Sequence, residues 1–140
     1  MRPLTKFSTE PPPSRRRAGT VLLWTAQILL GVGFVSMGII RLTGSSTAIE
    51  TFEQIGLGQW LRFVTGAVEL AGGVGLLIPR LAGPAATGLV GVMAGATAAN
   101  VLVLSPVMAV LTVALGVVAA GIAWARRAEV KDLLGRVIRR

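Results

Sequence analysis

Four long apolar stretches, separated by short polar or glycine- and proline-containing segments, dominate the pattern along the chain. They cover residues 20–40, 60–78, 84–104 and 106–125. Each is about 20 residues long, which at about 1.5 Å per residue matches a hydrocarbon core about 30 Å thick. None alternates between apolar and polar residues as barrel strands do, and a helix satisfies its own backbone hydrogen bonds in lipid. The pattern predicts an all-α protein with four membrane-spanning helices.

The connections between these stretches predict how the helices follow one another. The segment from Leu77 to Pro84 is a turn, and Pro84 suits the first position of a helix. Ser105 and Pro106 join the last two stretches almost directly. Because short connections make successive helices antiparallel neighbours, we expect an integral membrane four-helix up-down bundle over residues 20–125.

Composition agrees with this class, and the basic residues orient the bundle. The mean hydropathy is +0.73, and the net charge is +8. Lys and Arg concentrate on the cytoplasmic side of membrane proteins, so we expect both termini in the cytoplasm of a bacterial plasma membrane protein. No aromatic residues are interleaved with the charges, so we expect no nucleic-acid partner. The residues on the side of the termini are Arg2, Lys6, Arg15, Arg16, Arg17, Arg80, Arg126, Arg127, Lys131, Arg136, Arg139 and Arg140, whereas Arg41 and Arg62 lie on the other side.

The connection between the first two stretches predicts a short helix on the outer surface. Thr47 and Glu50 have the spacing of a capping box, and Gly56 or Gly58 can end the helix. Its apolar members can rest on the bundle or the lipid headgroups, with its polar members in water. The apolar members are Ile49, Phe52 and Ile55, and the polar ones are Glu53 and Gln54.

The N-terminal end of the chain is expected to lie outside the lipid. Residues 1–19 are basic, contain Pro11-Pro12-Pro13 and have no periodic apolar pattern, which predicts a disordered arm. Ser14 to Arg17 before an apolar stretch also resembles a twin-arginine export signal. Since the stretch is longer than that of a signal and three more follow, we expect a retained signal anchor.

Residues 126–140 have the pattern of a basic amphipathic helix. Its apolar residues recur at i, i+3, i+4, i+7 and i+8 and so form one stripe. We expect this tail to lie among the headgroups of the inner leaflet, attracted by anionic lipid, with docking against a partner subunit as the alternative. The stripe is Val130, Leu133, Leu134, Val137 and Ile138, and the expected lipid-binding residues are Arg126, Arg127, Lys131, Arg136, Arg139 and Arg140.

One carboxylate, Glu69, lies near the middle of the second apolar stretch. A charged group at that depth costs several kcal/mol, so Glu69 is expected to be neutral, or paired and turned away from lipid. Arg62 lies seven positions earlier on the same helix face, and Arg41 ends the first stretch on the same side of the membrane. With Gln27 and Asn100, the other polar groups at depth, these residues predict an intramembrane polar cluster. Either the cluster fixes the register of the helices, or Glu69 carries protons or contacts a quinone or substrate headgroup.

Strips of small residues spaced four apart predict where the helices approach each other closely. One strip is Gly91, Gly95 and Ala99 in the third stretch. The others are Thr112, Gly116 and Ala120 in the fourth stretch, and Ala67, Ala71 and Gly75 in the second.

The chain lacks cysteine and histidine altogether. This removes thiol exchange, thiolate metal sites and the usual haem and zinc ligand, so we expect no metal site and no cofactor held through such residues. No glycine-rich nucleotide-binding pattern stands in a suitable context. A redox role would have to borrow its cofactor, and a quinone is the candidate.

Several short motifs make the sequence similar to a known family. They are Gly38-Ile39-Ile40-Arg41-Leu42, Phe52-Glu53-Gln54-Ile55-Gly56-Leu57, Gly66-Ala67-Val68-Glu69-Leu70-Ala71-Gly72-Gly73 and Leu76-Leu77-Ile78-Pro79-Arg80. Over about residues 20–125 the chain resembles the DoxX-like family of small four-span bacterial membrane proteins. Many relatives carry histidine late in the third span, where this chain has Asn100.

The resemblance implies functions that the residues alone do not indicate. The family takes its name from small subunits associated with quinone-linked sulfur oxidation, and some relatives look like membrane anchors for redox partners. It implies a non-catalytic accessory or anchoring subunit of a redox-linked bacterial envelope complex, with lipid and other envelope subunits as partners. One alternative is a quinone-interacting oxidoreductase subunit with Glu69 and Arg41 lining the site, and another is a small transporter or channel.

Overall fold

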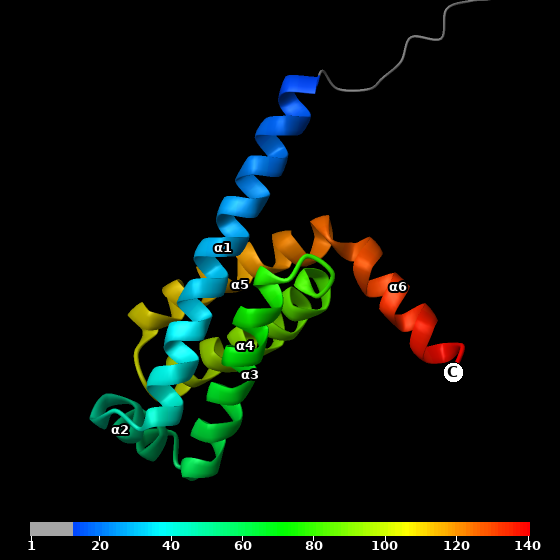
Figure 1. Cartoon of the computed structure of the whole chain (residues 1–140). Coiled ribbons are helices and arrows are strands. Elements are labelled where there is room, and N and C mark those ends of the chain that lie inside the picture. The colour runs from blue at the N-terminus through cyan, green and yellow to red at the C-terminus, as the bar shows by residue number, and fades with distance from the viewer. Residues whose placement is uncertain (1–12) are drawn as a thin grey trace, which may run out of the picture.

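The computed structural model describes residues 13–140 of the chain, which form six helices and no strand (Figure 1). Four of them, α1, α3, α4 and α5, are long and apolar enough to cross a membrane, which confirms an all-helical protein with four candidate spans. The short helices α2 and α6 follow the first and the last of these. The bounds are α1 Pro13–Thr43, α2 Ser46–Ile55, α3 Gln59–Leu77, α4 Ala82–Leu102, α5 Pro106–Ala125 and α6 Arg127–Ile138.

The first helix begins earlier than the apolar pattern predicts. Residues 13–19, expected in a disordered arm, are helical, while residues 1–12 of that arm lie outside the described residues. Arginine is a good helix former, and extending an existing helix costs far less than starting one. At 31 residues α1 is about 46 Å long, so its first turns extend beyond a hydrocarbon core about 30 Å thick.

Helices α1 and α3 pack closely against each other, backbone against backbone. Gly31 lies against Gly73, and Gly38 lies against Gly66, so the two helices contact each other in opposite sequence order. A Cβ atom at position 38 would stand 2.7 Å from the amide nitrogen of Leu70. Only glycine fits at such a distance, and in lipid this close approach supplies much of the attraction between helices. Pairs of glycines seven residues apart, one pair on each helix, therefore build this interface.

The predicted small-residue strips are only partly used, and the prediction for α4 is wrong. A Cβ atom at Gly91 or Gly95 would meet nothing within 4 Å. Instead α4 packs on α5 through Met93, which lies against Gly116, and through Thr97, whose hydroxyl lies 2.9 Å from that of Thr112. A strip of small residues with this spacing can face lipid as easily as it faces a neighbouring helix, because lipid and the neighbouring helix are both apolar.

The core lies where the four long helices meet, and it is small. Gly72 of α3 packs against Leu89 of α4, and Gly75 packs against Ala85, again in opposite sequence order. Helix α1 touches α5 only slightly, and α6 points away from the other helices (Figure 1). The buried apolar residues of this core are Leu30, Phe34, Leu76, Ala86, Leu89, Met93, Ala119 and Ile122.

Candidate functional site

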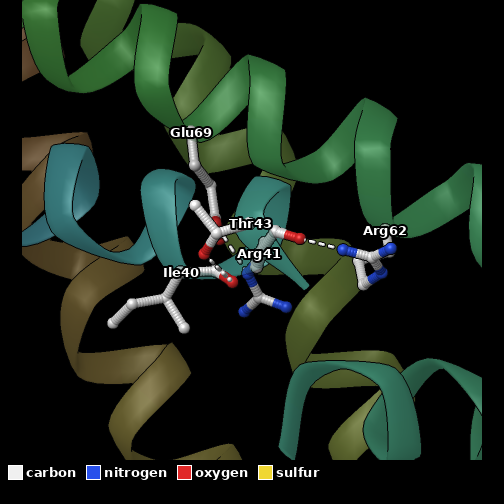
Figure 2. Close-up of polar contacts among 5 residues, drawn as sticks. All are labelled: Ile40, Arg41, Thr43, Arg62 and Glu69. Carbon is white, nitrogen blue, oxygen red and sulfur yellow. Dashed lines mark hydrogen bonds and ion pairs between the residues drawn. The ribbon is translucent and has the colours of Figure 1, made fainter. Parts of the chain in front are cut away.

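The C-terminal end of α1 is held by a glycine turn and by an arginine from α3. Gly44 has a φ of +74°, and the amide of Ser45 donates to the carbonyl of Ile40 at 3.4 Å, as in a Schellman motif. The Nη1 of Arg62 donates to the carbonyl of Arg41 in the last turn of α1 (Figure 2). A cation at this end also interacts favourably with the helix dipole. Arg62 therefore joins the end of α1 to the start of α3.

Arg62 itself is buried, and its remaining contacts reach α2. Its Nε donates to the side-chain oxygen of Gln59 at 2.8 Å, and its guanidinium lies 4.2 Å from the centre of the Phe63 ring. The amide of Gln59 in turn donates to the carbonyl of Ile49 at 3.1 Å. This chain of bonds connects α1, α3 and α2 at one end of the bundle.

Glu69 forms an ion pair with Arg41 (Figure 2). The Nε of Arg41 lies 2.7 Å from Oε2 of Glu69. Glu69 is 1% exposed, and the side chain of Arg41 is 19% exposed. Side chains on a helix lean towards its N-terminus, which brings the carboxylate of α3 to the level of the end of α1. A buried carboxylate is expensive unless it is paired in this way.

Helix α2 covers this pair, but its N-terminus differs from the prediction. Ser45, rather than Thr47, is the N-cap residue, and its hydroxyl accepts from the amide of Ala48 at 3.3 Å. Ser45 directly follows the left-handed Gly44 and has the extended backbone of an N-cap, whereas Thr47 already lies inside the helix. Gly56, with a φ of +77°, ends the helix, which was one of the two predicted positions.

The predicted faces of α2 are those of the structure. Phe52 is 4% exposed, and its ring lies 5.3 Å from the guanidinium of Arg41, whereas Glu53 and Gln54 are exposed. Phe52 therefore lies over the ion pair and limits the access of water to it.

Two of the five residues predicted for the polar cluster, Gln27 and Asn100, have hydrogen-bond partners outside it. Gln27 is fully buried and donates to the carbonyl of Leu76 at 2.5 Å, near the other end of α3. It lies fourteen positions before Arg41, which is about 21 Å along α1. Asn100 donates to the carbonyl of Ala96 in its own helix at 2.9 Å. The sequence shows that these residues lie within spans, but not their height or the face that they occupy.

A family model for the DoxX-like family matches residues 25–125, which cover α3, α4, α5, most of the apolar part of α1 and the ion pair. The protein belongs to the DoxX-like family. No match to the chain was found among curated proteins or solved structures. The matched residues end at α5, so the basic tail of this DoxX-like protein lies outside the part that the family model describes.

The tail of the DoxX-like protein is attached to the bundle through Glu129, a residue that the sequence did not single out. Its Oε2 accepts from the amide of Gly83 in the first turn of α4 at 3.2 Å, and its Oε1 lies 3.0 Å from Nη1 of Arg126. Arg126 also lies 5.3 Å from the ring of Trp24. Helix α4 starts at Ala82 without a side-chain cap of its own, and this was the available signal that an acidic group was needed there.

Apart from Glu129 and Arg126, the tail makes few contacts with the bundle. Arg127 donates to the carbonyl of Trp124 at 2.9 Å. Val130 and Leu133 of the predicted apolar stripe are partly buried. The remainder of the helix is exposed, both the apolar members Leu134, Val137 and Ile138 and the basic residues Lys131, Arg136, Arg139 and Arg140.

An apolar groove of about 420 Å³ runs between α1 and α5 of the DoxX-like protein. Its walls consist almost wholly of carbon, and the part that α1 contributes ends at Met37, one helical turn before Arg41. The lining residues include Leu29, Leu30, Gly33, Phe34 and Met37 of α1 and Leu115 of α5.

Proposed function

We propose that this DoxX-like protein crosses a bacterial plasma membrane four times in up-down order, with both termini in the cytoplasm and α2 on the outer surface. The contacts in opposite sequence order between α1 and α3, α3 and α4, and α4 and α5 support the order of the spans. The same contacts bring Trp24, Gly83 and Arg126 together at one end, opposite to Arg41 and Arg62. The excess of basic residues at the former end supports a cytoplasmic location for the termini.

We further propose that the protein is a non-catalytic accessory or anchoring subunit of a redox-linked envelope complex. The observation that supports this best is the burial of the ion pair between Glu69 and Arg41. The carboxylate is 1% exposed, and Arg41 and Arg62 connect it to the end of α1 and to α2. The pair therefore acts as a structural connection between three helices. The outward surface of α5, which includes Val107, Val110 and Val117, is exposed and apolar, as a helix that docks on another membrane subunit would be.

Purification from native membranes tests the accessory role. The full chain, with an affinity tag at its N-terminus, would be extracted gently and compared with an equally tagged, unrelated four-span protein. We expect specific envelope proteins to be recovered with this chain and not with the control. Recovery of the chain alone, after gentle extraction and after cross-linking in intact cells, would count against the proposal.

The groove beside Arg41 favours one further candidate, a quinone-interacting oxidoreductase subunit. An isoprenoid tail suits an apolar groove, and an arginine at its end can donate to a quinone carbonyl. In that case Glu69→Gln should change the quinone-dependent activity of the assembly, because Glu69 positions Arg41. Unchanged activity in this variant would remove the candidate.

A further inference from the structure

The cluster at the end of α1 has more positive than negative charge. It contains two arginines, Arg41 and Arg62, but one carboxylate, Glu69, which pairs with Arg41. Among residues 13–140 the exposed acids Glu50 and Glu53 of α2 pair with neither arginine. The carbonyls at the end of α1 offset part of the charge of Arg62. Glu69 offsets the charge of Arg41, so the cluster as a whole keeps an excess of positive charge.

The guanidinium of Arg41 also has unused donors. Its Nε is engaged by Glu69, but within the described part of the chain neither terminal nitrogen donates a hydrogen bond to any other group. Figure 2 shows these two nitrogens turned away from Glu69. They form a fork whose geometry matches two oxygens of a phosphate or carboxylate.

The apolar groove lies in line with this fork. Phe34 and Met37, which line the groove, precede Arg41 by seven and four positions and so share its face of α1. From Ala26 to Met37 the groove follows α1 for about 16 Å, a length suited to part of a lipid chain. Arg41 lies in the last turn of a membrane-spanning helix, so its fork is nearer to the lipid headgroups at that end than the groove is.

We propose that the structure forms a binding site for one phospholipid, with its phosphate on the terminal nitrogens of Arg41 and an acyl chain in the groove between α1 and α5. An anionic phosphate offsets the excess charge, which the neutral ring of a quinone does not. The proposal depends on the protein lying in a membrane and is independent of the accessory role.

The groove can be filled without disturbing the fold, because Gly33 lines it and a Cβ atom there would meet nothing within 4 Å. In Gly33→Leu the new side chain takes the place of the acyl chain. Gly91→Leu is the matched control, since Gly91 also has open space but lies on α4 away from the groove. The full-length protein would be stripped of lipid in detergent, and the affinity for dioleoyl phosphatidylglycerol measured by native mass spectrometry. We expect Gly33→Leu to weaken binding of the first lipid about tenfold and Gly91→Leu to leave it within about twofold.

The headgroup is tested separately by Arg41→Lys, which keeps a positive charge beside Glu69 but removes the fork. We expect Arg41→Lys to bind phosphatidylglycerol about tenfold more weakly than the unaltered protein does. We also expect the unaltered protein to bind dioleoylglycerol, which lacks the phosphate, more weakly than it binds phosphatidylglycerol. Thermal unfolding before lipid is added shows whether each variant is folded. If Arg41→Lys unfolds, the comparison of the two lipids on the unaltered protein decides the role of the phosphate.

Three results would overturn the proposal. The first is equal affinity of Gly33→Leu and Gly91→Leu for the phospholipid. The second is equal affinity of the unaltered protein for the two lipids. The third is displacement of the phospholipid by millimolar inorganic phosphate, which would indicate a site for a free anion. None of these results depends on whether envelope proteins are recovered with the chain, so the accessory role is tested independently.

Discussion

Replacement of Gly73 by alanine should force α1 and α3 apart and destabilise the protein. A Cβ atom at position 73 would lie 2.7 Å from the carbonyl oxygen of Gly31 and equally close to the amide nitrogen of Val35. Ordinary contact begins at 3.4 Å, so the backbones must separate by about the difference, roughly 0.7 Å. A gap of that size removes about a quarter to a half of each dispersion contact across the interface. We expect a loss of about 1–3 kcal/mol in the free energy of unfolding.

The change also reaches the ion pair one turn away. The ion pair between Arg41 and Glu69, with a distance of 2.7 Å, joins the same two helices. Moving α1 and α3 apart should therefore lengthen this distance and allow water to reach the pair. Unfolding of the full chain in mixed micelles, followed by the fluorescence of its tryptophans, measures the loss. Gly95→Ala is the matched control, because its Cβ would meet nothing within 4 Å and alanine favours helix. Equal midpoints for the two variants would refute the backbone contact as the source of stability.

Three further changes test the site and the tail. Arg41→Ala leaves Glu69 buried and unpaired, so the free energy of unfolding should fall by about 3–5 kcal/mol. Adding Glu69→Leu removes the unpaired carboxylate and should restore most of this loss, and a double variant as unstable as Arg41→Ala would contradict the reasoning. Gly44→Ala should cost about 1–2 kcal/mol, because Gly44 has a φ of +74°, and the same change at helical Gly88 should cost nothing; equal midpoints for the two would show that the turn at the end of α1 is not needed. Glu129→Ala removes the acceptor for the Gly83 amide, so amide hydrogen exchange should speed up in α6 and in the first turn of α4 while the core of the bundle keeps its protection. Unchanged exchange in α6 would show that Glu129 does not attach the tail.

Much of the candidate site follows from single positions in the sequence. A carboxylate such as Glu69 needs a cation or a proton at that depth, and the sequence predicts only two arginines, Arg41 and Arg62, on its side of the membrane. The choice between them depends on packing. Arg62 is on the same helix but donates to the end of α1, and Arg41, on another helix, takes the carboxylate. The position of a residue along its own helix predicts the helix face on which it lies. Which residue it pairs with depends on how the neighbouring helix packs against that face.

The sequence by itself determined the features that depend on local length, apolarity and backbone preference. These include four long apolar helices, the absence of strands from residues 13–140, and a glycine stop for α2, which the structure places at Gly56, one of the two predicted positions. A helix of about 20 mostly apolar residues satisfies its own backbone hydrogen bonds in lipid, so no tertiary information is needed to predict it.

Only the tertiary structure decided which faces of these helices meet and at what height. It selected Gly31, Gly38, Gly66 and Gly73 for the contact between α1 and α3 and left Gly91 and Gly95 open. It also placed Gln27 near the other end of α3, bonded Asn100 to its own helix and placed Glu129 on the start of α4. In a soluble protein the polar face of a helix shows which side is buried. A helix in lipid is apolar on all sides, so its rotation and depth depend on how its neighbours fit against it, which the order of residues along one helix does not show.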